Sequence, residues 1–156
     1  MRRALGLLLL GAALPASAQL SPAPPAASAG FTIDLTLSER AAAELARRNE
    51  GVVAAIWYRG EALPAHRRRA DEEGMIFLGE ERIAAAGRAG PILVTGRAYR
   101  RARSAWIRGP AQVTVNLFSA RRSDPNNLLE CGLIDAPLPQ VAGRRHALRC
   151  ALIGER

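Results

Sequence analysis

The sequence contains no lysine, only two cysteines, only two histidines and few aromatic residues. A protein zinc site needs three or four ligands at compatible spacing, and so few cysteines and histidines do not supply them. Cys131 and Cys150 form no CxxC pair, which is the spacing typical of thiol redox centres. On a strand, Cys150 and His146 would stand about 13 Å apart, too far to share one ion. The sequence therefore predicts neither a metal site nor a cofactor.

Short catalytic motifs are missing as well. The chain has no G-x-S-x-G elbow, no H-E-x-x-H, no P-loop and no G-x-G-x-x-G fingerprint. Two pairs of acidic neighbours, at 72–73 and 80–81, would point to opposite faces of a strand, so neither predicts a glycosidase dyad. The sequence favours a non-catalytic binding, accessory or structural domain. The alternative is a small secreted hydrolase that uses His66 with a nearby carboxylate.

The chain begins with MRRALGLLLLGAALPASAQL, which is typical of an export signal. Two arginines precede an apolar run of about eleven residues, and Ala-Ser-Ala then supplies the small residues that signal peptidase requires. The run is shorter than the roughly twenty residues of a membrane span, and no later segment is long and apolar enough. Residues 1–18 are predicted to be a signal peptide cut after Ala18, and residues 19–30 a flexible Pro/Ala-rich spacer. We therefore expect a periplasmic or secreted protein.

Export places the two cysteines in a compartment where disulfides persist. In strand geometry each cysteine shares a face with the leucines two positions before and after it, so both point toward the interior. The sequence therefore predicts one bridge between Cys131 and Cys150. In the chain-entropy model, closing a loop of about 20 residues contributes roughly 3 kcal/mol.

Residues 31–156 have the length and pattern of a single β-rich domain. Residues 31–37 alternate apolar and polar, as a half-buried strand does, and Ser38 is a plausible cap for a short helix after it. Further strands are expected at 52–58, 75–78, 91–99, 111–119, 128–134 and 147–153. Residues 80–86 either continue the strand at 75–78 or form a weak helical turn. We predict an antiparallel β-sandwich of immunoglobulin-like or transthyretin-like type with one short helix, and a small open β-barrel as the alternative.

The basic residues are all arginine, 22 in number, against 14 acidic residues. Removal of the signal peptide would leave 20 arginines and a net charge of +6. Such an excess favours anionic partners, and for an exported chain we expect an anionic envelope component or another envelope protein rather than nucleic acid. The alternative is that the arginines reflect a GC-rich genome, in which arginine replaces lysine for codon reasons.

The strongest local concentration of binding-type residues lies between Gly96 and Pro110. There arginines alternate with aromatic residues, and guanidinium forks grip phosphate or carboxylate groups while aromatic faces stack on ligands. A second arginine pair follows at 121–122. The candidate anion- or partner-binding residues are Arg97, Arg100, Arg101, Arg103, Trp106, Arg108, Arg121 and Arg122. The alternative is an irregular surface connection in which Trp106 is an inward anchor, and around His66 a solvated loop of mixed charge.

Overall fold

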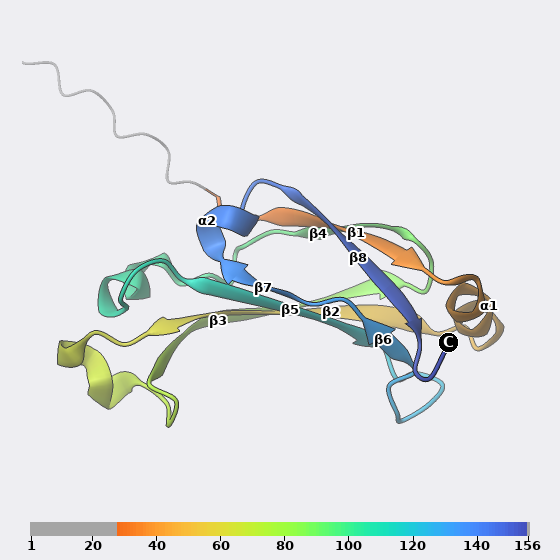
Figure 1. Cartoon of the computed structure of the whole chain (residues 1–156), viewed down its shortest axis with the longest axis horizontal. Coiled ribbons are helices and arrows are strands. Elements are labelled where there is room, and N and C mark those ends of the chain that lie inside the picture. Colours follow the sequence, from red (N-terminus) through yellow and green to blue (C-terminus); the bar gives the residue numbers. More distant parts are fainter. Residues whose placement is uncertain (1–27, 156) are drawn as a thin grey trace, which may run out of the picture.

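The computed structural model describes residues 28–155, so the predicted signal peptide lies outside the described residues. Its strands are β1 (Phe31–Leu37), β2 (Gly51–Glu61), β3 (Met75–Ala86), β4 (Gly90–Val94), β5 (Gln112–Ser119), β6 (Leu129–Cys131), β7 (Ile134–Pro137) and β8 (Arg145–Leu152). They form two sheets, β4-β1-β8-β6 and β3-β2-β5-β7, which lie face to face (Figure 1). The predicted β-sandwich is confirmed, and two separate sheets replace the alternative of a single open barrel.

Alternating apolar residues build the core between the sheets. Phe31, Ile33 and Leu35 of β1 are buried, and the residues between them are more exposed. β5 has the same period, with Val113 and Val115 fully buried. Burying an aliphatic side chain of this size contributes about 1.5–3 kcal/mol, which is why this period selects strands.

The predicted helix is present as α1 (Glu39–Arg47), and it closes one end of the sandwich (Figure 1). The Ser38 hydroxyl accepts a hydrogen bond of 3.0 Å from the backbone N–H of Ala41, which satisfies a free donor in the first helical turn. Ala41 and Leu45 are fully buried and attach the helix to the core. A second helix, α2 (Leu138–Val141), was not expected. Within residues 28–155, no helix has both the length and the apolar character needed to cross a membrane.

Two strand predictions and one side-chain orientation need correction. The segment expected at 91–99 leaves the sheet after Val94, because Gly96 has a positive φ of 70° and packs against the backbone of residues 29–30. The segment expected at 128–134 divides into β6 and β7, which belong to different sheets. Leu133 lies at the crossing and is 60% exposed, so it does not point inward as alternation predicted.

β8 pairs in parallel with β1 and antiparallel with β6. This parallel pair breaks the otherwise antiparallel pattern and was not expected from the sequence. Cys131 and Cys150 stand opposite each other in the β6–β8 pairing, and they form the predicted disulfide. Cys150 is fully buried, so the bridge fixes the short strand β6 to the core.

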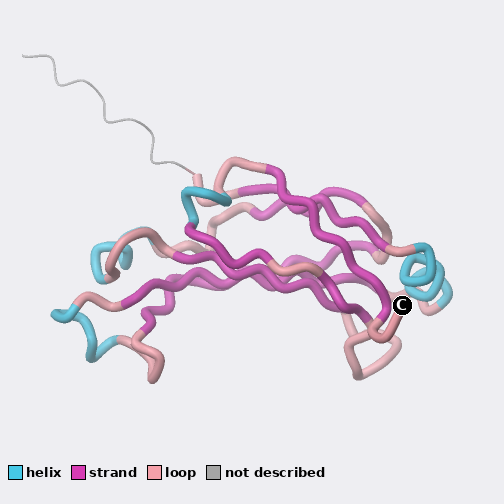
Figure 2. Tube along the Cα trace, viewed as in Figure 1, coloured by secondary structure: helices cyan, strands magenta, loops and turns pink. Residues whose placement is uncertain are grey.

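Two short 3₁₀ helices interrupt segments expected to be irregular. They are η1 (Pro64–Arg69) and η2 (Arg101–Trp106). Both lie at the end of the sandwich opposite α1 (Figure 2). β3 runs from Met75 to Ala86 with one bulge against β2, so residues 80–86 continue the strand and do not form the alternative helical turn.

Candidate functional site

Strand pairing brings two arginine-rich segments to the same end of the molecule. β2 and β5 are antiparallel neighbours, and Arg59 near the end of β2 is opposite Gln112 at the start of β5. The segment that follows β2 contains η1, and the segment that precedes β5 contains η2. Residues 61–73 and 97–108, which we call the arginine end, are therefore adjacent although they are distant in the sequence.

Backbone contacts hold the two segments together. Ala62 and Ile107 form an isolated antiparallel bridge, and Ile107 is buried beneath it. The backbone N–H of Leu63 donates to the carbonyl of Trp106 at 2.8 Å. The arginine end is thus an ordered extension of the sheet.

Trp106 lies at the centre of the arginine end. The guanidinium of Arg69 lies 4.5 Å from the centre of its ring, and that of Arg103 lies 5.8 Å away. The imidazole of His66 is 5.7 Å from the ring centre at an interplanar angle of 37°. The indole is half-buried and already covered, so the interpretation of Trp106 as an anchor describes it better than a ligand platform. A guanidinium that stacks on an aromatic face still has N–H groups at its edge that can bind an anion.

A second anchor holds the start of η2. The ring of Tyr99 packs against that of Tyr58 at 5.4 Å between centroids, and the hydroxyls of Tyr99 and Ser104 are 2.5 Å apart. The Tyr58 hydroxyl donates to the Glu81 carboxylate at 3.1 Å. Burial, together with the neighbouring Glu81 charge, raises the pKa of Tyr58, so the hydroxyl keeps its proton. The guanidinium of Arg101 lies 6.0 Å from the Tyr99 ring.

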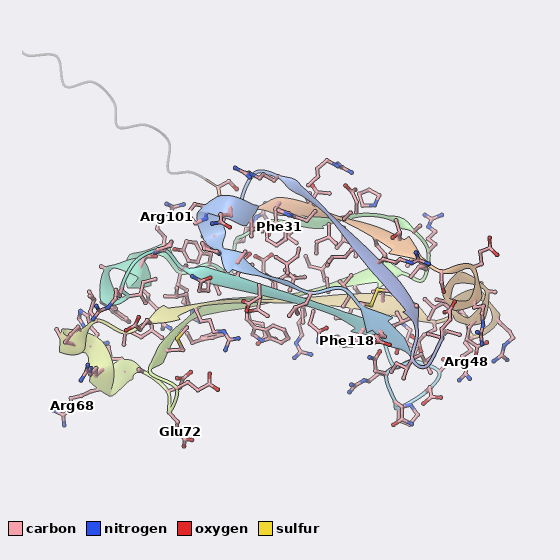
Figure 3. The ribbon with its side chains drawn as sticks, in the orientation of Figure 1. Phe31, Arg48, Arg68, Glu72, Arg101 and Phe118 are labelled. Atoms are coloured by element: carbon pink, nitrogen blue, oxygen red, sulfur yellow. A yellow bond between two sulfur atoms is a disulfide. The ribbon has the colours of Figure 1, made fainter. Side chains whose placement is uncertain are left out.

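The arginine end carries eight arginines and four acidic residues, and residues 97–108 contain no acid. Arg108 pairs with Glu61 at 3.5 Å, and both side chains are exposed. Arg103 donates to the carbonyl of Phe77 at 3.0 Å. Figure 3 shows Arg68 and Arg101 at this end of the ribbon. At the arginine end, four exposed arginines have neither an ion pair nor an aromatic contact among the described residues. These are Arg67, Arg68, Arg97 and Arg100.

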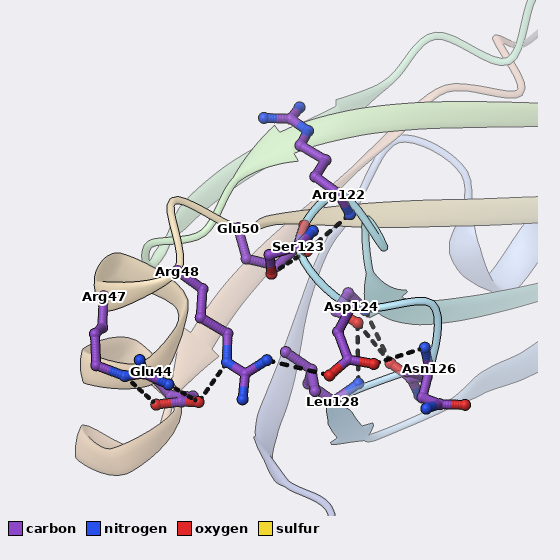
Figure 4. A network of polar contacts seen from close by, with 11 residues as sticks. Glu44, Arg47, Arg48, Glu50, Arg122, Ser123, Asp124, Asn126 and Leu128 are labelled. Carbon is purple, nitrogen blue, oxygen red and sulfur yellow. Dashed lines mark hydrogen bonds and ion pairs between the residues drawn. The ribbon is translucent and has the colours of Figure 1, made fainter.

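Arg121 and Arg122 do not belong to this cluster. They follow β5 at its opposite end, where the backbone N–H of Arg122 donates to Glu50, which comes shortly after α1. The guanidinium of Arg121 lies over Phe118 at 5.6 Å, and the side chain of Arg122 points away from the polar network around it (Figure 4). The predicted binding set is therefore divided between two ends of the sandwich.

Glu50 organises that opposite end, and sequence reasoning gave it no role. Only 4% of the residue is exposed. One carboxylate oxygen accepts from the backbone N–H groups of Arg122 and Ser123, each at 2.8 Å, and the other accepts from Gly51 at 2.8 Å (Figure 4). Burial acts to raise the pKa of Glu50, but these donors and the Ser123 hydroxyl outweigh it and hold the pKa below its usual value. The sequence signal that could have identified Glu50 is its position, just after a helix and before a buried strand.

Among residues 28–155, the structure gives His66 no carboxylate partner. Its side chain faces Trp106, and no hydrogen bond from the imidazole to an acid is found among residues 28–155. The Asp71 carboxylate, five residues later in the sequence, accepts hydrogen bonds from the backbone N–H groups of Glu73 and Met75 and stabilises a turn. The geometry therefore adds no support to the hydrolase alternative. Nor does the described part of the chain contain three or more His, Cys, Asp or Glu residues grouped to hold a metal.

Fold and site together define a disulfide-linked β-sandwich domain with an ordered, arginine-rich end. Comparison of the chain with protein-family models, with curated proteins and with solved structures finds no match. The function is therefore argued from the site itself.

Proposed function

We propose that the chain is an exported, non-catalytic binding domain that engages an anionic component of the cell envelope through its arginine end. The observation that carries the proposal is the packing of Arg69 and Arg103 on Trp106, which joins two arginine-rich segments into one ordered surface. Guanidinium groups held in this way lose little additional freedom when they bind, and their planar forks match phosphate and carboxylate groups.

Export is part of the proposal and rests on the N-terminal sequence. The disulfide between Cys131 and Cys150 supports it, since such bridges persist outside the reducing cytosol. The arrangement of the arginines favours an extended anion over a single small one. Arg67 and Arg68 lie on η1, and Arg97 and Arg100 lie on the other segment, so the charges are spread over a surface. An anionic lipid surface or an acidic envelope polymer presents such a spread of charge.

The proposal is tested by sedimentation with vesicles of phosphatidylglycerol and phosphatidylcholine, using the chain without its predicted signal peptide. Two double variants, Arg67→Ala with Arg68→Ala and Arg100→Ala with Arg101→Ala, each remove two charges from the arginine end. At about 1 kcal/mol for each arginine near an anionic surface, each double variant should bind about 30-fold more weakly. Raising the salt concentration should weaken wild-type binding.

The matched control removes the same charge from the opposite end, as Arg121→Ala with Arg122→Ala. The backbone N–H of Arg122 that reaches Glu50 survives this change. We expect the control to bind close to the wild type. Equal loss in all three double variants would show that net charge alone drives binding. Wild-type binding to pure phosphatidylcholine vesicles, or none to anionic vesicles, would contradict the proposal.

A further inference from the structure

The outer face of the β3-β2-β5-β7 sheet carries a groove beside the arginine end, and the acidic residues Asp71 and Glu73 of that end line it. Its floor is a depression of about 340 Å³, and a second depression of about 420 Å³ shares Arg59 with it. The first volume lies within the roughly 300–1,000 Å³ range of small-molecule sites. We call the two together the sheet groove. Its lining includes Trp57, Arg59, Asp71, Phe77, Thr114, Glu73 and Asp135.

Strand register explains why these side chains share one face. Trp57 is opposite Thr114 across β2 and β5, and Thr114 is opposite Asp135 across β5 and β7. Arg59, two residues after Trp57, is opposite Phe77 across β2 and β3. Residues opposite each other point to the same side of a sheet, so two neighbouring rows face solvent together.

The groove presents aromatic surface to solvent. Phe77 is 47% exposed, although most large apolar side chains of this domain are buried. Trp57 is half-buried, and unlike Trp106 it has no guanidinium stacked on its ring within the described chain. Exposed rings beside hydrogen-bonding groups are suited to a ligand that has both an apolar face and polar edges.

The polar groups of the groove are held in place by one another. Asp135 accepts from the Thr114 hydroxyl at 3.0 Å, and Arg59 donates to that hydroxyl at 3.5 Å. Arg59 also pairs with Glu73 at 3.7 Å. The Asp71 carboxylate accepts two backbone N–H groups through one oxygen. The second oxygens of Asp71 and Asp135 receive no hydrogen bond within residues 28–155, which leaves oriented acceptors beside the rings.

The charge of the groove favours a different kind of ligand from the one proposed for the arginine end. It contains three carboxylates and one guanidinium, so it does not favour an anion. Each carboxylate already has a donor or a cation beside it, so the groups act as hydrogen-bond acceptors rather than as unpaired charges. A ligand with many hydroxyl groups and apolar C–H faces satisfies both features.

We infer that the sheet groove binds a neutral oligosaccharide, with sugar rings against Trp57 and Phe77 and hydroxyl groups donating to Asp71 and Asp135. The two adjoining depressions suit a chain of linked sugars rather than a single one. This inference goes beyond the proposed function and does not depend on it, because none of the arginines proposed to bind the anion lines the groove.

The test titrates laminarihexaose, cellohexaose and chitohexaose into Trp106→Phe protein, in which Trp57 is the remaining tryptophan. At least one sugar should change the Trp57 fluorescence in a saturable way, with calorimetry confirming the affinity. In the same background, Phe77→Ala should weaken binding at least about tenfold. In the wild-type background, calorimetry should show the same loss for Trp57→Ala.

Thr114→Val tests whether the polar network contributes to sugar binding in addition to stacking on the aromatic rings. The substitution keeps the shape of the side chain and removes the hydroxyl that links Arg59 and Asp135. It should weaken binding while the unfolding midpoint stays near that of the wild type. The control is Leu93→Ala, an exposed apolar residue on β4 of the other sheet, which should bind like the wild type.

Three outcomes would overturn the inference. One is no binding of any of the three sugars by calorimetry up to about 10 mM. Another is sugar binding that survives both Phe77→Ala and Thr114→Val. The third is saturable binding of hexalysine at this groove without binding of the sugars, which would make it a cation site. Loss of vesicle binding in the arginine variants leaves these results unchanged, so the two proposals fail separately.

Discussion

The guanidinium of Arg69 stacks on the indole ring of Trp106, with 4.5 Å between the guanidinium carbon and the ring centre. This contact links η1 to η2, which are adjacent in space although β3 and β4 lie between them along the chain. A cation–π contact of this kind contributes about 0.5–1 kcal/mol at an exposed site. Its larger effect is positional, because it sets how the arginines of both segments face solvent.

Truncation of this anchor should impair vesicle binding without removing any charge. We expect Trp106→Ala to bind anionic vesicles more weakly than the wild type, whereas Trp106→Phe keeps an aromatic face and should lose less. Removing a fully buried tryptophan costs about 3–5 kcal/mol, so for this half-buried ring we expect a loss near 2 kcal/mol in urea unfolding. Wild-type vesicle affinity in Trp106→Ala would show that the arginines act without the anchor.

The disulfide should account for a large part of the stability of the domain. Replacing both cysteines, as Cys131→Ala with Cys150→Ala, frees a loop of about 20 residues and should lower the free energy of unfolding by roughly 3 kcal/mol. Urea unfolding monitored by circular dichroism measures the difference. As a direct check, alkylation of the denatured, unreduced protein should add no label, and two labelled thiols would refute the bridge.

Glu50 should make stability depend on pH. Its pKa is held below the ordinary value of about 4.5 in the folded state, so its stabilising effect is present above that pH and is lost as the pH falls through the folded value. Glu50→Gln keeps the size of the side chain but weakens the bonds from Arg122 and Ser123. We expect a loss of about 1–3 kcal/mol at pH 7.

The difference between wild type and Glu50→Gln should then shrink when unfolding is measured at progressively lower pH below about 4.5. A difference that stays constant down to acid pH would mean that the carboxylate charge contributes nothing. Glu130→Gln is the control, because Glu130 is exposed on β6 and forms no ion pair or side-chain hydrogen bond among the described residues.

Alanine substitutions at two glycines test how closely the arginine end packs against β3. Gly79 and Gly90 both have positive φ angles, of 142° and 152°, so alanine is strained at either position. A Cβ at Gly79 would also lie 2.0 Å from the carbonyl oxygen of Ala98, whereas at Gly90 no atom is within 4 Å. We expect Gly90→Ala to cost about 1–3 kcal/mol and Gly79→Ala clearly more.

Vesicle binding by the Gly79→Ala protein should also fall, because the backbone of Ala98 must move and it precedes Tyr99 at the base of η2. Binding and thermal unfolding measured on both variants distinguish the two effects. Equal unfolding midpoints for the two proteins would show that the contact between Gly79 and Ala98 carries no strain.

Local patterns predicted much of this fold because they depend on short-range physics. Alternation in residues 31–37 identified β1, and Ser38 identified the start of α1, since both are set by neighbours in sequence. The same reasoning paired the cysteines correctly, because parity placed both toward the interior. It failed at Leu133, where the chain passes from one sheet to the other and the alternation no longer refers to one face.

The sequence by itself determined that this chain has arginine but no lysine, one pair of cysteines and enough alternating apolar residues for a sandwich. Tertiary structure alone decided which arginines stand together, because the β2–β5 pairing moves residues 61–73 beside 97–108 and sends 121–122 to the far end. It also decided that Trp106 is covered while Trp57 faces an open groove. Neighbours across a sheet are set by strand order and register, and no local pattern in the sequence encodes them.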